Sequence, residues 1–191
     1  DDAASGIAVT DDELDEVVAS LLGGRDRHLV VAADLTSPEQ AVAAAAAVRD
    51  GLGSADVLLH LVGTFRGGAG LAQTASSDWQ LLFEVNLWTA VRTLAAFLLQ
   101  LVDGDRGRIV GVSTPFAQAP SGTNAAYAAS KAALEAVILS LARELRGQHV
   151  TANVVVVRSI RPGQPSSPTP EDKGGWTTPE EIAAAMLWLC S

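Results

Sequence analysis

The chain has little cysteine, few aromatic residues and few positive charges. Its single cysteine, Cys190, excludes an internal disulfide and makes the cytoplasm the expected location. The 13 Lys and Arg residues are outnumbered by 22 Asp and Glu, which gives a net charge of −9. Because phosphate contacts need clustered Lys and Arg, nucleic acid is a poor partner for such a chain, and we expect no nucleic-acid binding.

Long uninterrupted apolar runs are also missing. The candidates, residues 43–48 and 154–157, are far shorter than the roughly 20 apolar residues of a membrane span. The N-terminus shows no basic region followed by an apolar run, so we expect no signal peptide and no membrane partner. Hydrophobic residues still make up 48% of the chain, which excludes disorder and suits one domain, residues 1–191, with a sizeable core.

Short β-branched runs alternate along the chain with Ala- and Leu-rich stretches at helical spacing. The predicted strands are residues 28–33, 56–62, 108–112 and 150–157, each apolar nearly throughout, as in a parallel sheet covered on both faces. The predicted helices are residues 11–22, 37–52, 77–102, 123–145 and 178–189. This alternation predicts an α/β fold: a doubly wound, Rossmann-like parallel sheet in three layers, α/β/α.

A fold of this kind normally begins with a strand and a Gly-rich turn that holds a pyrophosphate at a helix N-terminus. No such turn precedes the first predicted helix. Gly63, Gly67, Gly68 and Gly70 follow a strand, but the next helix starts only near Ser77, so we interpret them as a loop. The sequence therefore predicts a fold lacking the N-terminal βα unit and the C-terminal strand.

The most informative motif is Tyr127-Ala-Ala-Ser-Lys131. A spacing of four places Tyr127 and Lys131 on one face of a helix. A phenol has an ordinary pKa near 10, and a neighbouring ammonium lowers it; a lowering of about two units requires roughly 2.7 kcal/mol. The pair suits acid/base catalysis, and the alternative is a surface Tyr and Lys without a joint role.

Three further polar residues are candidates for a site. Residues 107–114 form a strand that ends in two hydroxyls, Ser113 and Thr114, where an open α/β sheet places its ligands; alternatively, they cap the strand. Asn86 lies in an apolar helix and needs a buried partner, unless it bonds to its own helix backbone. Asp34 follows the strand 28–33 and could accept a hydrogen bond from an adenine amino group or form a turn before Ser37.

Together these residues, in this order, resemble the short-chain dehydrogenase/reductase family. The resemblance runs from about Asp34 to Ile160, with a weaker echo at residues 178–191. Its elements are Ala33-Asp34-Leu35-Thr36, residues 55–63, Val85-Asn86-Leu87, residues 107–114, Tyr127-Ala-Ala-Ser-Lys131 and Thr151-Ala-Asn153. The resemblance implies hydride transfer between a nicotinamide cofactor, NAD or NADP, and a small-molecule alcohol or carbonyl substrate.

The resemblance also implies roles for individual residues. Tyr127 would be the acid/base, Lys131 would tune its pKa and bind the ribose, and Asn86 would hold a water that links Lys131 to solvent. Thr114 matches the register of the family's catalytic hydroxyl, and Ser113, one residue away on the opposite face, is the alternate. Cofactor contacts fall on Asp34, Leu35, Val62, Gly63, Tyr127, Lys131 and Ile160. No metal site is expected.

The sequence departs from the family pattern at two further places. His60-Leu61-Val62-Gly63 stands where the family usually has Asn-Asn-Ala-Gly, and we interpret His60 as a core residue. Val157-Arg158 stands where Pro-Gly is expected, and the stretch from Pro162 to Thr178 is short for a substrate lid. Two alternatives stay open: a binding or scaffold subunit with this fold, and an epimerase or dehydratase that uses the same Tyr/Lys pair.

The helices at residues 77–102 and 123–145 carry more apolar residues than one buried face needs. Family members often pair these helices across a two-fold axis, so we expect a homo-dimer or homo-tetramer. Phe97 and Leu94 are the residues expected at that interface. The alternative is that other segments of the same subunit cover this face.

Overall fold

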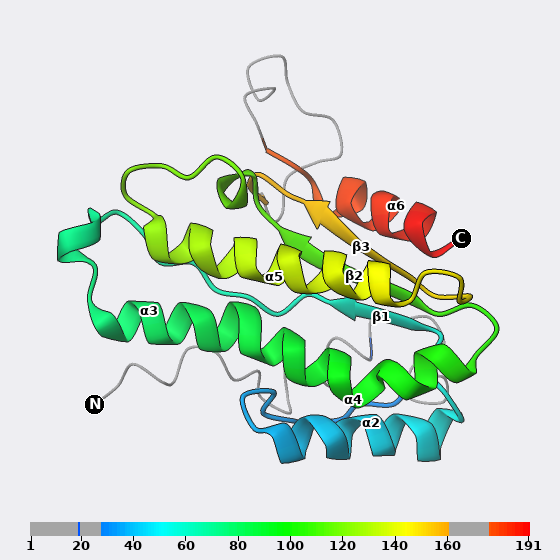
Figure 1. The fold of residues 1–191 in the computed structure, drawn as a ribbon. Coiled ribbons are helices and arrows are strands. Elements are labelled where there is room, and N and C mark those ends of the chain that lie inside the picture. Colours follow the sequence, from blue (N-terminus) through cyan, green and yellow to red (C-terminus); the bar gives the residue numbers. More distant parts are fainter. Residues whose placement is uncertain (1–18, 20–27, 161–175) are drawn as a thin grey trace.

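The computed structural model describes residues 19, 28–160 and 176–191 (Figure 1). The predicted helix 11–22 therefore lies almost entirely outside the described residues. The helices are α2 (Pro38–Leu52), α3 (Ser76–Phe83), α4 (Thr89–Asp103), α5 (Ala125–Glu144) and α6 (Pro179–Cys190). The strands are β1 (Val57–His60), β2 (Arg108–Ser113) and β3 (Thr151–Val156).

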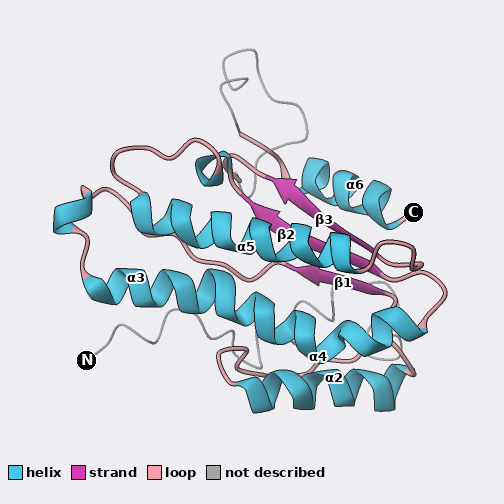
Figure 2. Cartoon of the chain, in the orientation of Figure 1, coloured by secondary structure: helices cyan, strands magenta, loops and turns pink. Residues whose placement is uncertain are grey.

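The three strands form one parallel sheet in the order β1-β2-β3, as Figure 2 shows. Val57 pairs with Arg108, and Arg108 pairs with Thr151, so the carboxyl ends of the strands meet at one edge. The chain passes from β1 to β2 through α3 and α4, and from β2 to β3 through α5, in the alternation that the sequence predicted. The predicted parallel α/β fold is confirmed.

Helices cover both faces of the sheet. Gly111 faces α5 so closely that a Cβ atom there would lie 2.3 Å from Cδ1 of Ile138. Side chains alternate along a strand, so Ile109 and Ser113 point toward α5 and Val110 points to the other face, where α6 packs on β2 and β3. The core on the α5 side includes Leu134 and Ile138, both fully buried.

The predicted strand at residues 28–33 is wrong. These residues have no strand structure, and Leu29 is exposed. An extended segment becomes a strand only when its N–H and C=O groups pair with a neighbour, and no strand in the described part of the chain lies beside this one. The apolar run alone did not correctly predict a strand, because pairing depends on residues distant in sequence.

The predicted helix 77–102 is interrupted by a π-helical turn, Glu84–Trp88, between α3 and α4. The Thr89 N–H bonds to the Glu84 carbonyl, five residues back, and the Thr89 hydroxyl donates to the Val85 carbonyl at 2.6 Å. The wider turn contains Asn86, whose side chain is fully buried. Such turns occur often at functional sites, because they redirect a side chain without ending the helix.

Two predicted helix starts are confirmed by their capping bonds. The Ser37 hydroxyl accepts from the Gln40 N–H at 3.3 Å, with Pro38 in the first turn. Thr178 and Glu181 form a reciprocal capping box at the start of α6. These local signals were readable because each depends on residues within one turn of the chain.

The segments Ser76–Asp103 and Ala125–Glu144 are long and apolar enough to cross a membrane by length and composition alone. Core helices of water-soluble folds pass the same test. Here both segments pack near the sheet, and both bury polar groups: Asn86 and Thr93 in the first, and Lys131 in the second. Leu94 and Phe97, expected at an interface between subunits, instead belong to the core of this subunit.

Candidate active site

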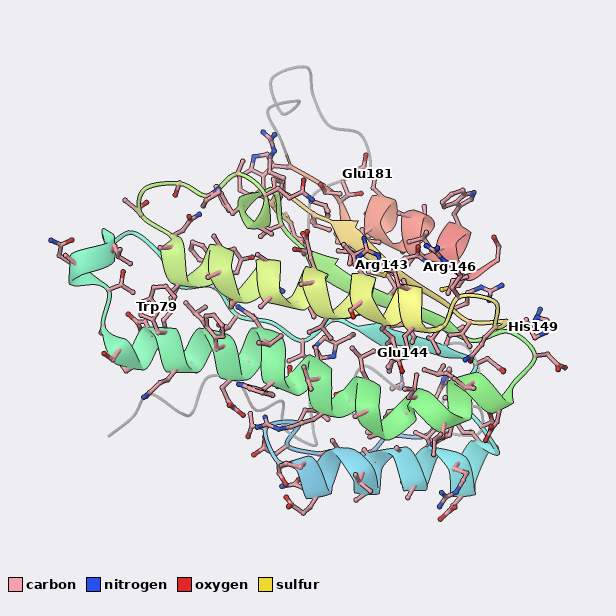
Figure 3. All side chains as sticks on the ribbon, viewed as in Figure 1. Trp79, Arg143, Glu144, Arg146, His149 and Glu181 are labelled. Carbon is pink, nitrogen blue, oxygen red and sulfur yellow. The ribbon has the colours of Figure 1, made fainter. Side chains whose placement is uncertain are left out.

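Tyr127 and Lys131 project from the first turns of α5 into a cavity at the carboxyl ends of β2 and β3. The cavity has a volume of about 490 Å³. It is lined by Phe65, Val112, Ser113, Thr114, Phe116, Tyr127, Lys131, Val157, Arg158, Ser159, Ile160 and Trp176. Arg143 and Glu144 lie in the last turn of α5, at the end of the helix opposite Tyr127 and Lys131 (Figure 3). The predicted Tyr/Lys pair and both candidate hydroxyls therefore share one cavity.

Tyr127 is half-buried against Phe65, whose ring meets the phenol ring edge-on with a centroid distance of 4.8 Å. Burial raises the pKa of Tyr127, and a hydrogen bond with the Thr114 side chain offsets part of this rise. The expected lowering of this pKa by Lys131 is not found here. Desolvation disfavours the phenolate, so the protein holds Tyr127 in its protonated, proton-donating form.

Lys131 is a buried ammonium that donates to the Val112 carbonyl at 3.1 Å. Burial lowers its pKa to about 8, so most Lys131 side chains carry a charge at neutral pH. Among the described residues, the hydrogen-bond partner of this ammonium is one carbonyl near the end of β2. The Lys131 side chain is therefore buried, which contradicts the alternative of a surface Tyr and Lys without a joint role.

Gly63 approaches Lys131 and Asn86 more closely than any residue with a side chain could without displacing them. A Cβ atom at Gly63 would lie 3.0 Å from Nζ of Lys131 and 3.2 Å from Oδ1 of Asn86. The family resemblance assigned Gly63 to the cofactor, and the geometry supplies a reason for glycine there. Val62 is half-buried beside it and lines neither cavity of the described structure.

Asn86 is bonded to protein on both sides of its amide. Its Oδ1 accepts from the Thr64 N–H at 2.7 Å, and its Nδ2 donates to the Thr64 carbonyl and to Oγ of Ser130, each at 3.0 Å. Asn86 thus joins the π-helical turn to the loop after β1 and to α5. This excludes the alternative in which Asn86 bonds only to its own helix, and its predicted role in holding a water stays a prediction.

The two candidate hydroxyls differ in their surroundings. The Thr114 side chain offsets part of the rise in the pKa of Tyr127, and it accepts from the Phe116 N–H at 3.4 Å, which caps the short helical turn Pro115–Ala117. The Ser113 hydroxyl is buried and has no hydrogen-bond partner among the described residues. The geometry favours Thr114 beside Tyr127, in agreement with its register in the sequence.

His60 is buried at the end of β1, as predicted for a core residue. Its Nε2 lies 3.4 Å from the Thr89 hydroxyl. Burial, and secondarily the charge of Lys131, lowers the pKa of His60 to about 4. His60 is therefore a neutral side chain at neutral pH.

The structure does not bring the predicted adenine contacts to this cavity. Asp34 is exposed, and its Oδ1 accepts from the Thr36 N–H at 2.9 Å and from the Thr36 hydroxyl at 2.7 Å, which lowers the pKa of Asp34. Leu35 is half-buried beside it. This is the turn alternative for Asp34; an adenine contact stays a prediction. Ile160 does line the cavity and forms an isolated bridge with Thr177.

The sequence interpretation missed the aromatic wall of the cavity. Phe65, Phe116 and Trp176 come from three segments that lie far apart in the sequence. Phe65 lies two residues after Gly63 and Phe116 two residues after Thr114, so proximity to motif residues was the available signal. Trp176 gave none, because it reaches the cavity only through the tertiary fold.

Comparisons with known proteins agree with this geometry. A family model described as short chain dehydrogenase matches residues 3–169. A 1-deoxy-11-beta-hydroxypentalenate dehydrogenase from Streptomyces exfoliatus is 31% identical over 198 aligned residues, which cover 97% of this chain and 70% of that protein. A short-chain type dehydrogenase/reductase from Picea abies is 32% identical over 73% of this chain, and the chain spans only 55% of that relative's length.

Solved structures show the same relationship. An NADPH-bound short chain oxidoreductase from Pseudomonas aeruginosa PAO1, described as containing an atypical catalytic center, superposes with a TM-score of 0.73 at 25% identity, covering 83% of this chain and 67% of that one. The ligand-free aldohexose dehydrogenase from Thermoplasma acidophilum superposes with a TM-score of 0.75 at 21% identity, which supports the fold. With a family model matching most of its length, the chain belongs to the short chain dehydrogenase family.

Proposed function

We propose that this protein is an NAD(P)-dependent oxidoreductase that acts on a small-molecule alcohol or carbonyl, with Tyr127 as its acid/base. The observation that carries the proposal is the convergence of Tyr127, Thr114 and Lys131 in one cavity at the carboxyl edge of the sheet. Relatives named as dehydrogenases and reductases support the reaction class.

The residues fit the nicotinamide end of such a cofactor. Gly63 leaves open the space that a side chain would fill next to Lys131, and Ser113 offers an unused buried hydroxyl to the cavity. Lys131, Gly63 and Ile160 are the residues proposed to hold it. When bound, the cofactor would supply or accept a hydride. The NADPH-bound Pseudomonas relative supports this assignment.

The protein's own groups would manage the proton. Thr114 and Tyr127 line the same cavity, and the Thr114 side chain offsets part of the rise in the pKa of Tyr127, so both hydroxyls are placed to reach one substrate oxygen. Because burial keeps Tyr127 protonated, it is set up to donate a proton to a carbonyl oxygen that gains charge. Lys131, one helical turn away, lines the same cavity as a cation but does not lower the pKa of Tyr127, so we assign it to holding the cofactor.

The cofactor assignment is tested through Gly63. Replacing Gly63 with Val places a Cβ atom 3.0 Å from Nζ of Lys131 and 3.2 Å from Oδ1 of Asn86, so that both side chains must shift. We expect NADPH and NADH binding, measured by fluorescence titration, to weaken about tenfold or more, since charge-assisted hydrogen bonds from Lys131 would be lost. Gly122→Ala is the matched control, because a Cβ atom there meets nothing within 4 Å. Unchanged cofactor affinity in Gly63→Val would exclude a cofactor contact at this position.

A binding or scaffold subunit is the second candidate. The observation in its favour is that Asn86 and Lys131 are already bonded within the protein, which gives both a structural role without turnover. The same titration, paired with a carbonyl-reduction assay, distinguishes the two candidates. An enzyme binds the cofactor and oxidises NADPH or NADH in the presence of a carbonyl compound, whereas a scaffold does not.

A further inference from the structure

We propose that Arg158 is the oxyanion-binding residue of this cavity and that the substrate is a carbonyl or alcohol carrying a carboxylate on an apolar body. This inference rests on the proposed function and names the substrate class for the same site. It starts from the charge of the cavity lining rather than from the catalytic motif.

The cavity is positively charged within an acidic protein. Among the described residues, its lining contains two cationic residues, Lys131 and Arg158, and no Asp or Glu. The chain as a whole has 22 acidic against 13 basic residues, so a lining with only positive charge differs from the average surface. Low-dielectric walls concentrate that potential, which favours an anionic ligand.

Arg158 is the cation of the two that remains available. Lys131 donates to the Val112 carbonyl and lies between Gly63 and Asn86. Arg158 is exposed to the cavity and forms no ion pair or hydrogen bond with the described residues. Arg66, which lines the neighbouring cavity of about 310 Å³, instead pairs with Asp78 at 2.8 Å. In the neighbouring cavity the positive charge of Arg66 is therefore neutralised by Asp78, whereas no described acidic residue neutralises Arg158 in this cavity.

The backbone around Arg158 is held in place on both sides. The Val157 N–H donates to the Ser113 carbonyl at 2.9 Å, which extends the pairing of β3 with β2 up to the cavity. The Ser159 carbonyl accepts from the Thr177 N–H at 2.8 Å. Because the backbone on both sides of Arg158 is held, binding of a ligand by the guanidinium need not order this segment, which limits the entropy lost on binding.

The remaining walls define the other part of the ligand. Phe65, Phe116 and Trp176 supply aromatic surface, and Val157 and Ile160 supply aliphatic surface. A guanidinium presents a planar fork of N–H donors that matches the two oxygens of a carboxylate. Apolar walls, one free guanidinium and the Tyr127 hydroxyl together fit a molecule with an apolar body, an acid group and an oxygen that can be reduced or oxidised.

A phosphate of the cofactor is the other source of an oxyanion in this region. We assign Arg158 to the substrate because it lines the same cavity as Tyr127 and Thr114, where a substrate oxygen must lie. The experiment separates the two sources by measuring cofactor binding alongside substrate selectivity.

The test compares acids with their neutral esters in wild type and Arg158→Met. Phenylpyruvate, benzoylformate and levulinate, each with its methyl ester, are the probes, with NADPH or NADH as reductant. We expect wild type to prefer at least one acid over its ester. Arg158→Met should lower kcat/KM for that acid about 10- to 100-fold, mainly through KM, because a charge-assisted hydrogen bond is lost. Values for the ester and the cofactor dissociation constant should stay within about threefold, and Arg158→Lys should restore part of the loss.

Other outcomes overturn the inference. Equal losses for acid and ester, together with weaker cofactor binding, would assign Arg158 to a cofactor phosphate. No change for any probe would show that Arg158 meets no oxyanion. Calorimetric titration of the acids into wild type and Arg158→Met measures acid binding directly, so it tests the inference even when no turnover occurs. Arg158-dependent acid binding without NADPH oxidation would support the oxyanion site while contradicting the proposed function. Absence of such binding in an active enzyme would contradict the inference alone.

Discussion

Among single residues, the proposed function predicts that the hydroxyl beside Tyr127 helps to hold the substrate oxygen. The Thr114 side chain offsets part of the rise in the pKa of Tyr127, while Ser113, on the adjacent strand position, is buried without a hydrogen-bond partner among the described residues. An unpartnered buried hydroxyl costs free energy that its removal returns. The two neighbours should therefore respond oppositely to the same substitution.

We predict that Thr114→Ala lowers kcat/KM about 100-fold, as expected for losing a donor to the developing oxyanion. Ser113→Ala should keep activity within a few-fold and leave the free energy of unfolding unchanged or slightly raised. Steady-state kinetics and urea unfolding of both variants check this. The reverse order of activity losses would identify Ser113 as the catalytic hydroxyl.

The residues that the structure brings together in the candidate site were largely readable from the sequence, and the reason is spacing. Tyr127 and Lys131 are linked by one helical turn, so sequence distance fixes their geometry. Arg158 and Trp176 reach the cavity through contacts between distant segments, which no local pattern encodes. Asp34 was predicted as an adenine contact, but in the structure its carboxylate forms a turn with Thr36 outside the cavity. An Asp in an exposed turn and an Asp that contacts a ligand look alike in sequence.

At the scale of elements, β1 and the π-helical turn are joined through buried polar groups. His60 at the end of β1 meets Thr89, whose hydroxyl also bonds to Val85 in that turn. Lys131 of α5 is the charged group that faces His60. The turn itself could not be predicted, because its one sign in the sequence was a lone Asn86 in an apolar helix. The false strand at residues 28–33 has a related cause, since apolar content does not specify a pairing partner.

The buried His60 predicts a pH-dependent stability. Its pKa is about 4 in the folded protein, against 6.5 for the ordinary side chain. Between these values the unfolded chain binds a proton that the folded chain excludes. The free energy of unfolding should therefore be highest above pH 6.5 and fall by about 3 kcal/mol as the pH drops to about 4.

Urea unfolding of wild type and His60→Gln across this range measures the effect. In His60→Gln, the free energy of unfolding should lose most of the pH dependence that His60 supplies. The control variant His149→Gln, changed at an exposed histidine, should keep this pH dependence. If the free energy of unfolding varies with pH in the same way in wild type and in His60→Gln, protonation of His60 does not affect the stability of the fold.

At the scale of the whole molecule, apolar residues remain exposed on the helices that cover the β1–β3 sheet. Leu99 on α4 is 73% exposed and Leu139 on α5 is 51% exposed. Figure 1 shows α5 beside α3, with α4 continuing from α3. Leu94 and Phe97, which the sequence analysis expected at an interface, are 5% and 9% exposed and belong to the core instead. Helical periodicity therefore identified an excess of apolar residues, but it did not show which of them face the sheet and which face outward.

We predict a homo-dimer or homo-tetramer held through α4 and α5, and Leu99→Glu or Leu139→Glu should dissociate it without unfolding the subunit. Val42→Glu, a change at an exposed apolar residue of α2, is the control and should leave the assembly intact. Light scattering at micromolar concentration gives the masses, with circular dichroism to check folding. A wild-type monomer would contradict the prediction.

The central claim is that the cavity around Tyr127 carries out carbonyl reduction or alcohol oxidation with Tyr127 as the acid/base. Tyr127→Phe tests it most directly, because the change removes one hydroxyl and leaves the ring against Phe65. NADPH or NADH oxidation with a carbonyl substrate should fall about 100- to 10,000-fold, while the cofactor dissociation constant stays within a few-fold. Turnover within a few-fold of wild type would contradict the claim.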